Sequence, residues 1–129
     1  MTKNKRLTDQ IRTYIIKCSP HDFINLTVNE IARRFNITVP DLSRAFKKEQ
    51  EINLRKFIFN EKITRSRYLL KRYQQLTVKE VAEVLGYSSS NYFIRIFKNK
   101  VGVTPGKFRK INGGFFGLFD RRKNYRDRR

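Results

Sequence analysis

The sequence is poor in the residues that build covalent cross-links, metal sites and membrane spans. It has one cysteine, Cys18, and one histidine, His21, which excludes an internal disulfide and a cysteine-based zinc site. No apolar run approaches the ~18 residues that a membrane span needs, and the N-terminus has no apolar stretch of signal-peptide type. We therefore expect a reduced, cytoplasmic setting without metal, cofactor or membrane partner.

Few residues of this chain are suited to enzymatic catalysis. Cys18 and His21 lie three positions apart and form the one candidate pair of nucleophile and base. The simpler interpretation is that Cys18 packs on the first helix and His21 lies in the loop that follows. The sequence contains no phosphate loop and no plausible triad, and one histidine limits general-base chemistry. We expect a protein that is not an enzyme.

Acidic residues are scarce too. Thirty Lys and Arg stand against 11 Asp and Glu, so the formal net charge is +19, spread along the chain. Self-repulsion of this size favours a polyanionic partner. Nucleic acid is the first candidate and an anionic membrane surface the second, and the plain alternative is a soluble basic protein without such a partner.

The most informative stretch is 76–109, LTVKEVAEVLGYSSSNYFIRIFKNKVGVTPGKFR. Thr77 and Glu80 have the spacing of a capping box, and Gly86 ends the helix that they begin. The serines after it offer a second N-cap, and a short third helix opens at Pro105. Apolar residues recur at helical spacing in both main helices: Val78, Val81, Ala82, Leu85, Phe93, Ile96 and Phe97. This is the pattern of a helix-turn-helix motif.

The same pattern occurs earlier in the chain. LTVNEIARRF at 26–35 matches LTVKEVAEVL at 76–85, with Thr27 and Glu30 as the capping pair. Asn36, which tolerates the left-handed conformation, replaces Gly86, and Pro40 falls in the first turn of the next helix. The match continues past the turn with one residue inserted in the second copy. Two copies predict two subdomains rather than a repeat array.

Periodicity and breaks divide the chain into four parts. We expect an N-terminal subdomain at 1–53, which begins with a helix at 7–18 and continues through a loop at 21–26. A linker helix at 54–73, a second subdomain at 74–111 and a flexible Gly/Phe/Arg-rich tail at 112–129 follow. A linker of about 19 residues is ~28 Å long, which is commensurate with the ~34 Å between major-groove faces of one side of B-DNA.

Taken together, these motifs resemble the AraC/XylS family of bacterial transcription regulators over residues 7–111. The resemblance implies an all-α fold of about seven helices with two helix-turn-helix motifs, of the stand-alone type without a ligand-binding domain. In the second half it rests on Ala82, Gly86-Tyr87, Asn91-Tyr92-Phe93, Arg95, Phe97-Lys98, Gly102, Thr104-Pro105 and Phe108-Arg109. In the first half it rests on Leu42-Ser43-Arg44, Phe46-Lys47-Lys48, Phe57-Ile58, Lys62-Ile63, Ser66 and Leu69-Leu70.

The resemblance also implies base contacts on the exposed faces of two recognition helices. These positions are Pro40, Ser43 and Arg44 in the first motif, and Ser90, Asn91, Tyr92 and Arg95 in the second. Pro40 offers only shape and its neighbour Asp41 repels phosphate, so whether the first motif reads bases or only anchors stays open.

Several of these residues have a second interpretation. Arg44 and Arg95 are suited to contact guanine or phosphate, and the alternative for each is a surface salt bridge. Asn91 could contact adenine or could be the N-cap of its helix. Tyr92 could contact a thymine methyl group or a phosphate, and the alternative is a half-buried packing role. Flexible lysines suit phosphate better than bases, and helix N-termini bind phosphate through their N–H groups. The expected phosphate contacts are Thr27, Lys47, Lys48, Thr77, Lys98 and Lys100.

We therefore predict a sequence-specific double-stranded DNA-binding transcription regulator, with activation as the expected sense. It is expected to be nucleoid-associated and to bind as a monomer, with RNA polymerase as a candidate partner. One alternative is a non-specific architectural or RNA-binding basic protein. Another is an interaction module whose tail binds a membrane, a protein or an anionic small molecule, since Arg121, Arg122 and Arg126 have the RRxxxR spacing of PilZ-type cyclic-dinucleotide binders.

Overall fold

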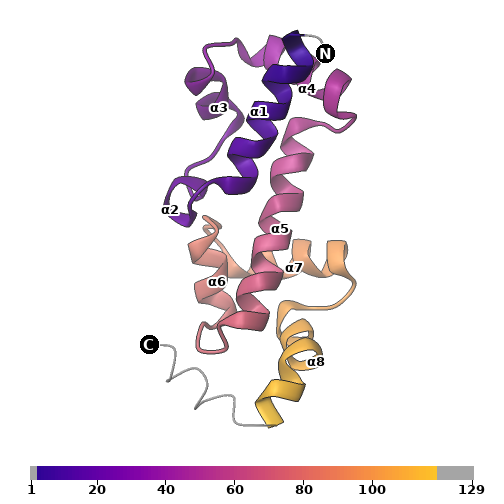
Figure 1. Cartoon of the computed structure of the whole chain (residues 1–129). Coiled ribbons are helices and arrows are strands. Elements are labelled where there is room, and N and C mark those ends of the chain that lie inside the picture. Colours follow the sequence, from indigo (N-terminus) through magenta and orange to yellow (C-terminus); the bar gives the residue numbers. More distant parts are fainter. Residues whose placement is uncertain (1–2, 119–129) are drawn as a thin grey trace. The chain divides into compact units, whose positions relative to one another are not determined.

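The structure is a computed structural model that describes residues 3–118, and the side chains of residues 3–112. Every regular element in this described part is a helix (Figure 1). The helices are α1 (Lys3–Lys17), α2 (Pro20–Phe23), α3 (Val28–Arg34), α4 (Val39–Gln50), α5 (Leu54–Arg72), α6 (Val78–Val84), α7 (Ser90–Val101) and α8 (Pro105–Leu118). The all-α fold is confirmed, with α2 as a helix beyond the expected seven.

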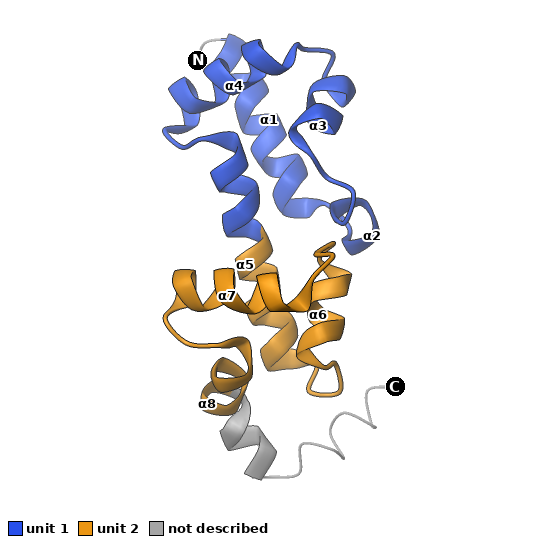
Figure 2. Ribbon diagram, turned by 180° about the vertical axis from the view of Figure 1, so that it is seen from behind, with its two compact units in different colours: residues 1–61 blue, residues 62–129 orange. Residues whose placement is uncertain are grey.

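The chain divides into two compact units, residues 1–61 and 62–129 (Figure 2). The first holds the helix pair α3 and α4, and the second holds the pair α6 and α7. The division falls inside α5, whose bounds agree with the linker helix expected from the sequence. Each unit thus includes part of the linker, and each carries one of the two copies of the repeat.

The core of the first unit lies where α1 and α3 pack against α4. Ile11 and Ile15 of α1, Ile31 of α3, and Leu42 and Phe46 of α4 are completely buried. A polar clamp ties the C-terminal end of α4 to α1, because the Gln50 amide donates to Thr8 Oγ1 at 2.9 Å and to Asp9 Oδ1 at 2.7 Å. Burial of these apolar side chains stabilises the position of α4.

The segment after α1 differs from the expected loop. Pro20–Phe23 forms a single helical turn, α2. Ser19 Oγ accepts a hydrogen bond from Asp22 N at 3.1 Å, and Pro20 occupies the first helical position, where its missing N–H is not needed. Phe23 is buried and holds this turn against the core. The loop expected at 21–26 thus begins with a helical turn, because Ser19 and Pro20 start one.

In the second unit, α7 packs against α6 and α8. Val81, Phe93 and Phe97 are completely buried. The rings of Phe97 and Phe108 meet edge to face, with centroids 5.5 Å apart. Phe46 and Phe57 form the equivalent pair in the first unit, at 5.6 Å. Phe93 and Phe97, expected on the apolar faces, are therefore core residues, and Phe46 and Phe108 are buried as well. The repeat seen in the sequence is a repeat of packing.

The last helix is longer than the short helix expected at Pro105. Thr104 Oγ1 accepts from Lys107 N at 3.2 Å and begins α8, which continues to Leu118. Arg109 fastens α8 to the end of α5 by donating to the carbonyl oxygens of Leu70, at 2.9 Å, and Tyr73, at 3.2 Å. The start expected for the tail, residue 112, thus lies within α8. Residues 119–129, with the RRxxxR spacing, lie outside the described part.

Candidate nucleic-acid interface

The turns of the two motifs have the same backbone geometry. Asn36 and Gly86 both have positive φ, 55° and 90°. In each turn the next residue's N–H returns to the alanine of the preceding helix, from Ile37 to Ala32 O and from Tyr87 to Ala82 O, both at 3.0 Å. The left-handed residue after the first helix is what redirects the chain toward the second. The prediction for Asn36 is confirmed.

The first helix of each motif begins at the expected threonine. Thr77 Oγ1 accepts from Glu80 N at 3.0 Å, and Glu80 Oε1 accepts from Thr77 N at 2.9 Å, so the capping box is complete. Thr27 Oγ1 accepts from Glu30 N at 3.0 Å. The Glu30 carboxylate, however, pairs with the Arg33 guanidinium one turn along α3, so the second arm expected at Thr27 is replaced by an ion pair.

These contacts also shift the pKa of the carboxyl groups of Glu30 and Glu80. The Arg33 hydrogen bond lowers the pKa of Glu30, and the hydrogen bond from the Thr77 backbone lowers the pKa of Glu80. Both carboxylates are therefore charged at neutral pH. Thr27 and Thr77 are exposed at the starts of α3 and α6, where helix N–H groups and the helix dipole favour an anion.

The recognition helices α4 and α7 are capped by Thr38 and Ser89. Thr38 Oγ1 accepts from Asp41 N and Ser89 Oγ accepts from Tyr92 N, both at 3.2 Å. The N-cap alternative for Asn91 is therefore wrong, because Ser89 makes this contact. Asn91 is the second residue of α7 and its side chain is exposed.

On α4, the predicted base-contact residues Pro40, Ser43 and Arg44 are all exposed, and Leu42, Ala45 and Phe46 face the core. Arg44 is not isolated, because its guanidinium donates to Asp41 Oδ1 at 2.5 Å. The Arg44 side chain remains 74% exposed and that of Asp41 58% exposed. An ion pair this exposed contributes little to the stability of the fold.

On α7, Asn91, Tyr92 and Arg95 are exposed and Ser90 is half-buried. The Arg95 guanidinium carbon lies 5.4 Å from the centre of the Tyr92 ring, within the range of a cation–π contact. The Tyr92 ring is also 6.1 Å from that of Tyr87 and is 48% exposed. Tyr92 thus packs on its neighbours and still presents half of its surface.

Tyr87 and Lys62 support this face and were not among the predicted site residues. Lys62 Nζ lies 4.9 Å from the centre of the Tyr87 ring. The Tyr87 hydroxyl is buried and has no hydrogen-bond partner among the described residues. Burial raises the pKa of Tyr87 to about 12 and lowers the pKa of Lys62. The cation and aromatic contacts run in series from Lys62 through Tyr87 and Tyr92 to Arg95.

The predicted phosphate contacts add charge to the same helices. Lys47 and Lys48 lie in the last turn of α4, and Lys98 and Lys100 in the last turn of α7. All four side chains are exposed. Exposed lysines at this end of a recognition helix attract phosphate without reading bases.

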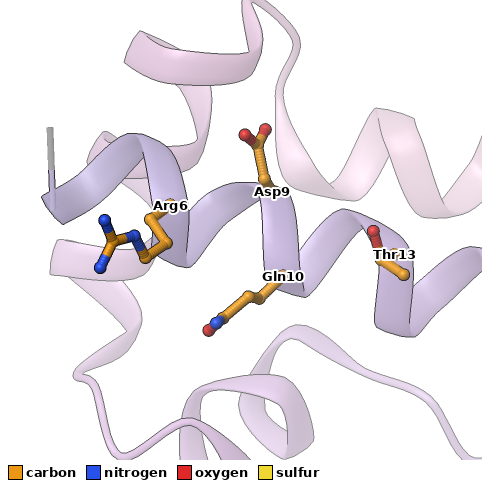
Figure 3. Close-up of a pocket in the computed structure, with 4 residues that line it drawn as sticks. All are labelled: Arg6, Asp9, Gln10 and Thr13. Carbon is orange, nitrogen blue, oxygen red and sulfur yellow. The ribbon is translucent and has the colours of Figure 1, made fainter. Parts of the chain in front are cut away.

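No other feature of the described residues offers a stronger site. A shallow depression on α1 is lined by Arg6, Asp9, Gln10 and Thr13 (Figure 3), and Asp9 is already bound by Gln50 and Lys5. Among residues 3–118, no group of three potential metal-ligating side chains occurs and no helix is long and apolar enough to cross a membrane. Cys18 is buried, and His21 is exposed on α2, rather than in a loop.

Comparison with known proteins identifies the protein family to which the chain belongs. A family model described as a helix-turn-helix domain matches residues 31–111, and the chain belongs to this family, as an AraC-type helix-turn-helix domain of transcription regulators. The resemblance to the AraC/XylS family is thereby confirmed.

Particular relatives agree with this assignment. The uncharacterized HTH-type transcriptional regulator YfiF of Bacillus subtilis is 40% identical over 86 residues, which are 67% of this chain and 27% of that protein. The Msm operon regulatory protein of Streptococcus mutans is 35% identical over 86 residues, 67% of this chain and 31% of that protein. The chain thus spans less than a third of the length of these curated relatives.

A solved structure has the same fold. The C-terminal domain of AraT, a response regulator from Geobacillus stearothermophilus, superposes with a TM-score of 0.73 and 27% identity, covering 85% of this chain and 88% of that one. The family is one of DNA-binding regulator domains and not an enzyme family.

Proposed function

We propose that this chain binds double-stranded DNA at specific sequences and regulates transcription. One observation carries the proposal: the equivalent arginines of the two recognition helices, Arg44 and Arg95, both stand on exposed helix faces opposite a buried apolar stripe. A guanidinium in this position suits bidentate contact with guanine in the major groove. The net charge of +19 supplies the general attraction to phosphate.

We assign the two kinds of contact to different residues. Pro40, Ser43, Arg44, Ser90, Asn91, Tyr92 and Arg95 are the proposed base contacts. Thr27, Lys47, Lys48, Thr77, Lys98 and Lys100 are the proposed phosphate contacts. Exposure of the side chains supports their access to DNA, with Ser90, which is half-buried, as the weakest member.

We further propose that a single copy of the chain reads two segments of one duplex. Support comes from α5, which is one uninterrupted helix of 19 residues between the two motifs. Its length of ~28 Å is commensurate with a helical turn of B-DNA, ~34 Å. In this arrangement no second copy is needed to bind a bipartite site.

The remaining parts of the proposal concern the cell. We propose an activator that contacts RNA polymerase, located in the cytoplasm with the nucleoid, without enzymatic activity and without a membrane partner. The name of the Streptococcus mutans relative, an operon regulatory protein, is consistent with regulation of transcription.

Selection of bound duplexes from a random DNA pool tests the proposal, at about 150 mM salt, where charges further apart than ~8 Å are screened. We expect a bipartite motif with its halves about one helical turn apart. A single enriched half shows that one motif alone reads bases. No enrichment, with binding that fades steeply as salt rises, favours a non-specific nucleic-acid binder instead.

A further inference from the structure

The two motifs hold their equivalent arginines by different chemistry. In α4 and α7 alike, the third helical residue lies three positions before the arginine and contacts it. In the first motif that residue is Asp41, whose carboxylate oxygen is 2.5 Å from the Arg44 guanidinium. In the second it is Tyr92, whose ring lies under Arg95. Arg44 is therefore neutralised by its partner, and Arg95 keeps its full charge.

We infer that Asp41 is a positioning residue that sets the specificity of the first motif by directing Arg44 to bases rather than to phosphate. This inference rests on the proposed function and assigns a role to a residue that was expected only to repel phosphate. It also decides between the two roles left open for the first motif, base reading and anchoring, in favour of base reading.

The charge of Asp41 is the first argument. In a chain of +19 with 11 acidic residues, a carboxylate that is 58% exposed on the recognition helix opposes contact with a polyanion. Paired with Arg44, it leaves a locally neutral group on the exposed face of α4. Such a pair gains little from a phosphate, because the attraction of the guanidinium is offset by repulsion of the carboxylate.

The geometry of the guanidinium is the second argument. An arginine has five N–H donors in a rigid fork, and the bond to Asp41 is made by one terminal nitrogen. The remaining donors stay available to the paired acceptors O6 and N7 of guanine. Because the tether restricts rotation of the long side chain, it lowers the entropy lost when those donors meet a base.

Asp41 also has a structural role, and the test must distinguish this role from the effect of its charge on Arg44. Its backbone N–H donates to Thr38 Oγ1, and a carboxylate in the first turn of a helix interacts favourably with the helix dipole. Asp41→Asn keeps the backbone contact and the side-chain shape and removes the charge. Glu30→Gln is a matched control, because it removes one carboxylate from another exposed pair at the same spacing, Glu30 with Arg33, in the same unit.

The experiment is random-pool selection followed by competition binding with the full chain, for wild type, D41N, R44A, D41N/R44A and E30Q, with the melting temperature of each. We expect D41N to bind unrelated DNA more tightly and to lose about two- to fivefold discrimination at one position of one half-site, the range set by an exposed ion pair. E30Q is expected to tighten all duplexes alike without this loss. In the R44A background, D41N is expected to change discrimination no further.

Three kinds of result overturn the inference, and a fourth overturns the proposed function as well. One is a D41N protein with an unchanged binding motif, and another is a loss of discrimination that persists in D41N/R44A or appears equally in E30Q. The third is a wild-type motif with a single half whose discrimination is unaffected by R44A, which shows that the first motif only anchors. A wild-type protein that enriches no motif overturns the proposed function itself, and this inference with it.

Discussion

The Arg95 guanidinium carbon lies 5.4 Å from the centre of the Tyr92 ring, on the exposed face of α7. The contact joins two residues that the family resemblance assigns to DNA. It holds the guanidinium without neutralising it. The Tyr87 ring lies next to the Tyr92 ring, with centroids 6.1 Å apart. Arg95 is thus oriented before any ligand arrives and retains all its hydrogen-bond donors.

Substitution of Arg95 tests the base-reading role directly. We expect Arg95→Ala to weaken binding to the selected site by about 1–3 kcal/mol and to relax specificity in one half-site only. Lys98→Ala, on the same helix, is the control and should weaken all sequences alike. Competition binding with matched and mismatched duplexes measures both. Equal weakening of every sequence by Arg95→Ala would show that Arg95 contacts phosphate.

The capping box at α6 predicts a stability effect. Thr77→Ala removes the acceptor for Glu80 N, and we expect the free energy of unfolding to fall by about 1 kcal/mol. Urea denaturation followed by circular dichroism measures the change. Thr64→Ala, at an exposed position within α5, is the control and should be neutral or slightly stabilising. Equal effects of the two substitutions would contradict a capping role.

The buried rings that support the recognition helices predict a larger effect. Phe97 is completely buried and contacts both Phe93 and Phe108. Phe97→Ala should lower the free energy of unfolding by about 3–5 kcal/mol, because it leaves a cavity under α7. Tyr92→Ala, which removes a ring that is half exposed, is expected to have a much smaller effect on unfolding. If Phe97→Ala changes the free energy of unfolding only slightly, Phe97 is not a central residue of the core of this unit.

Tyr87 predicts a dependence on alkaline pH. Its pKa is raised from 10.0 to about 12 because burial disfavours the charged phenolate. Because the phenol ionises near pH 10 in the unfolded chain and near pH 12 in the folded chain, the free energy of unfolding falls as pH rises from 10 to 12. Tyr87→Phe should remove this loss, and with it the tyrosinate absorbance that appears near pH 12. Absorbance titration and urea unfolding at pH 9 and 12 measure the two effects.

At neutral pH the same substitution has a different expected result. The Tyr87 hydroxyl is buried without a partner in the described part of the chain, and an unsatisfied buried hydroxyl is unfavourable. Tyr87→Phe should therefore leave stability unchanged or raise it slightly, while keeping the ring contacts with Tyr92 and Lys62. A clear loss of stability would show that the hydroxyl makes a hydrogen bond.

Much of the fold follows from local signals in the sequence. Thr27, Thr77 and the serines near 89 have side chains that cap helices by contacts within three residues, and Asn36 and Gly86 tolerate the positive φ that ends a helix. Periodic apolar residues then determine which helix faces are buried. Such interactions are local, so the two motifs and the bounds of α5 could be predicted from the sequence, and the second copy of the repeat supports each assignment.

The sequence pattern did not decide how polar side chains choose among several partners. Within single helices, Glu30 has the spacing to cap α3 and pairs with Arg33 instead, and Arg44 pairs with Asp41. Only the tertiary structure decided the remaining contacts. Phe23 makes α2 a helical turn because a buried position is available to it. The stack from Lys62 through Tyr87 to Tyr92 joins α5 to the turn and to α7. Competing contacts of similar energy, and burial by distant segments, depend on positions in space that local sequence patterns do not encode.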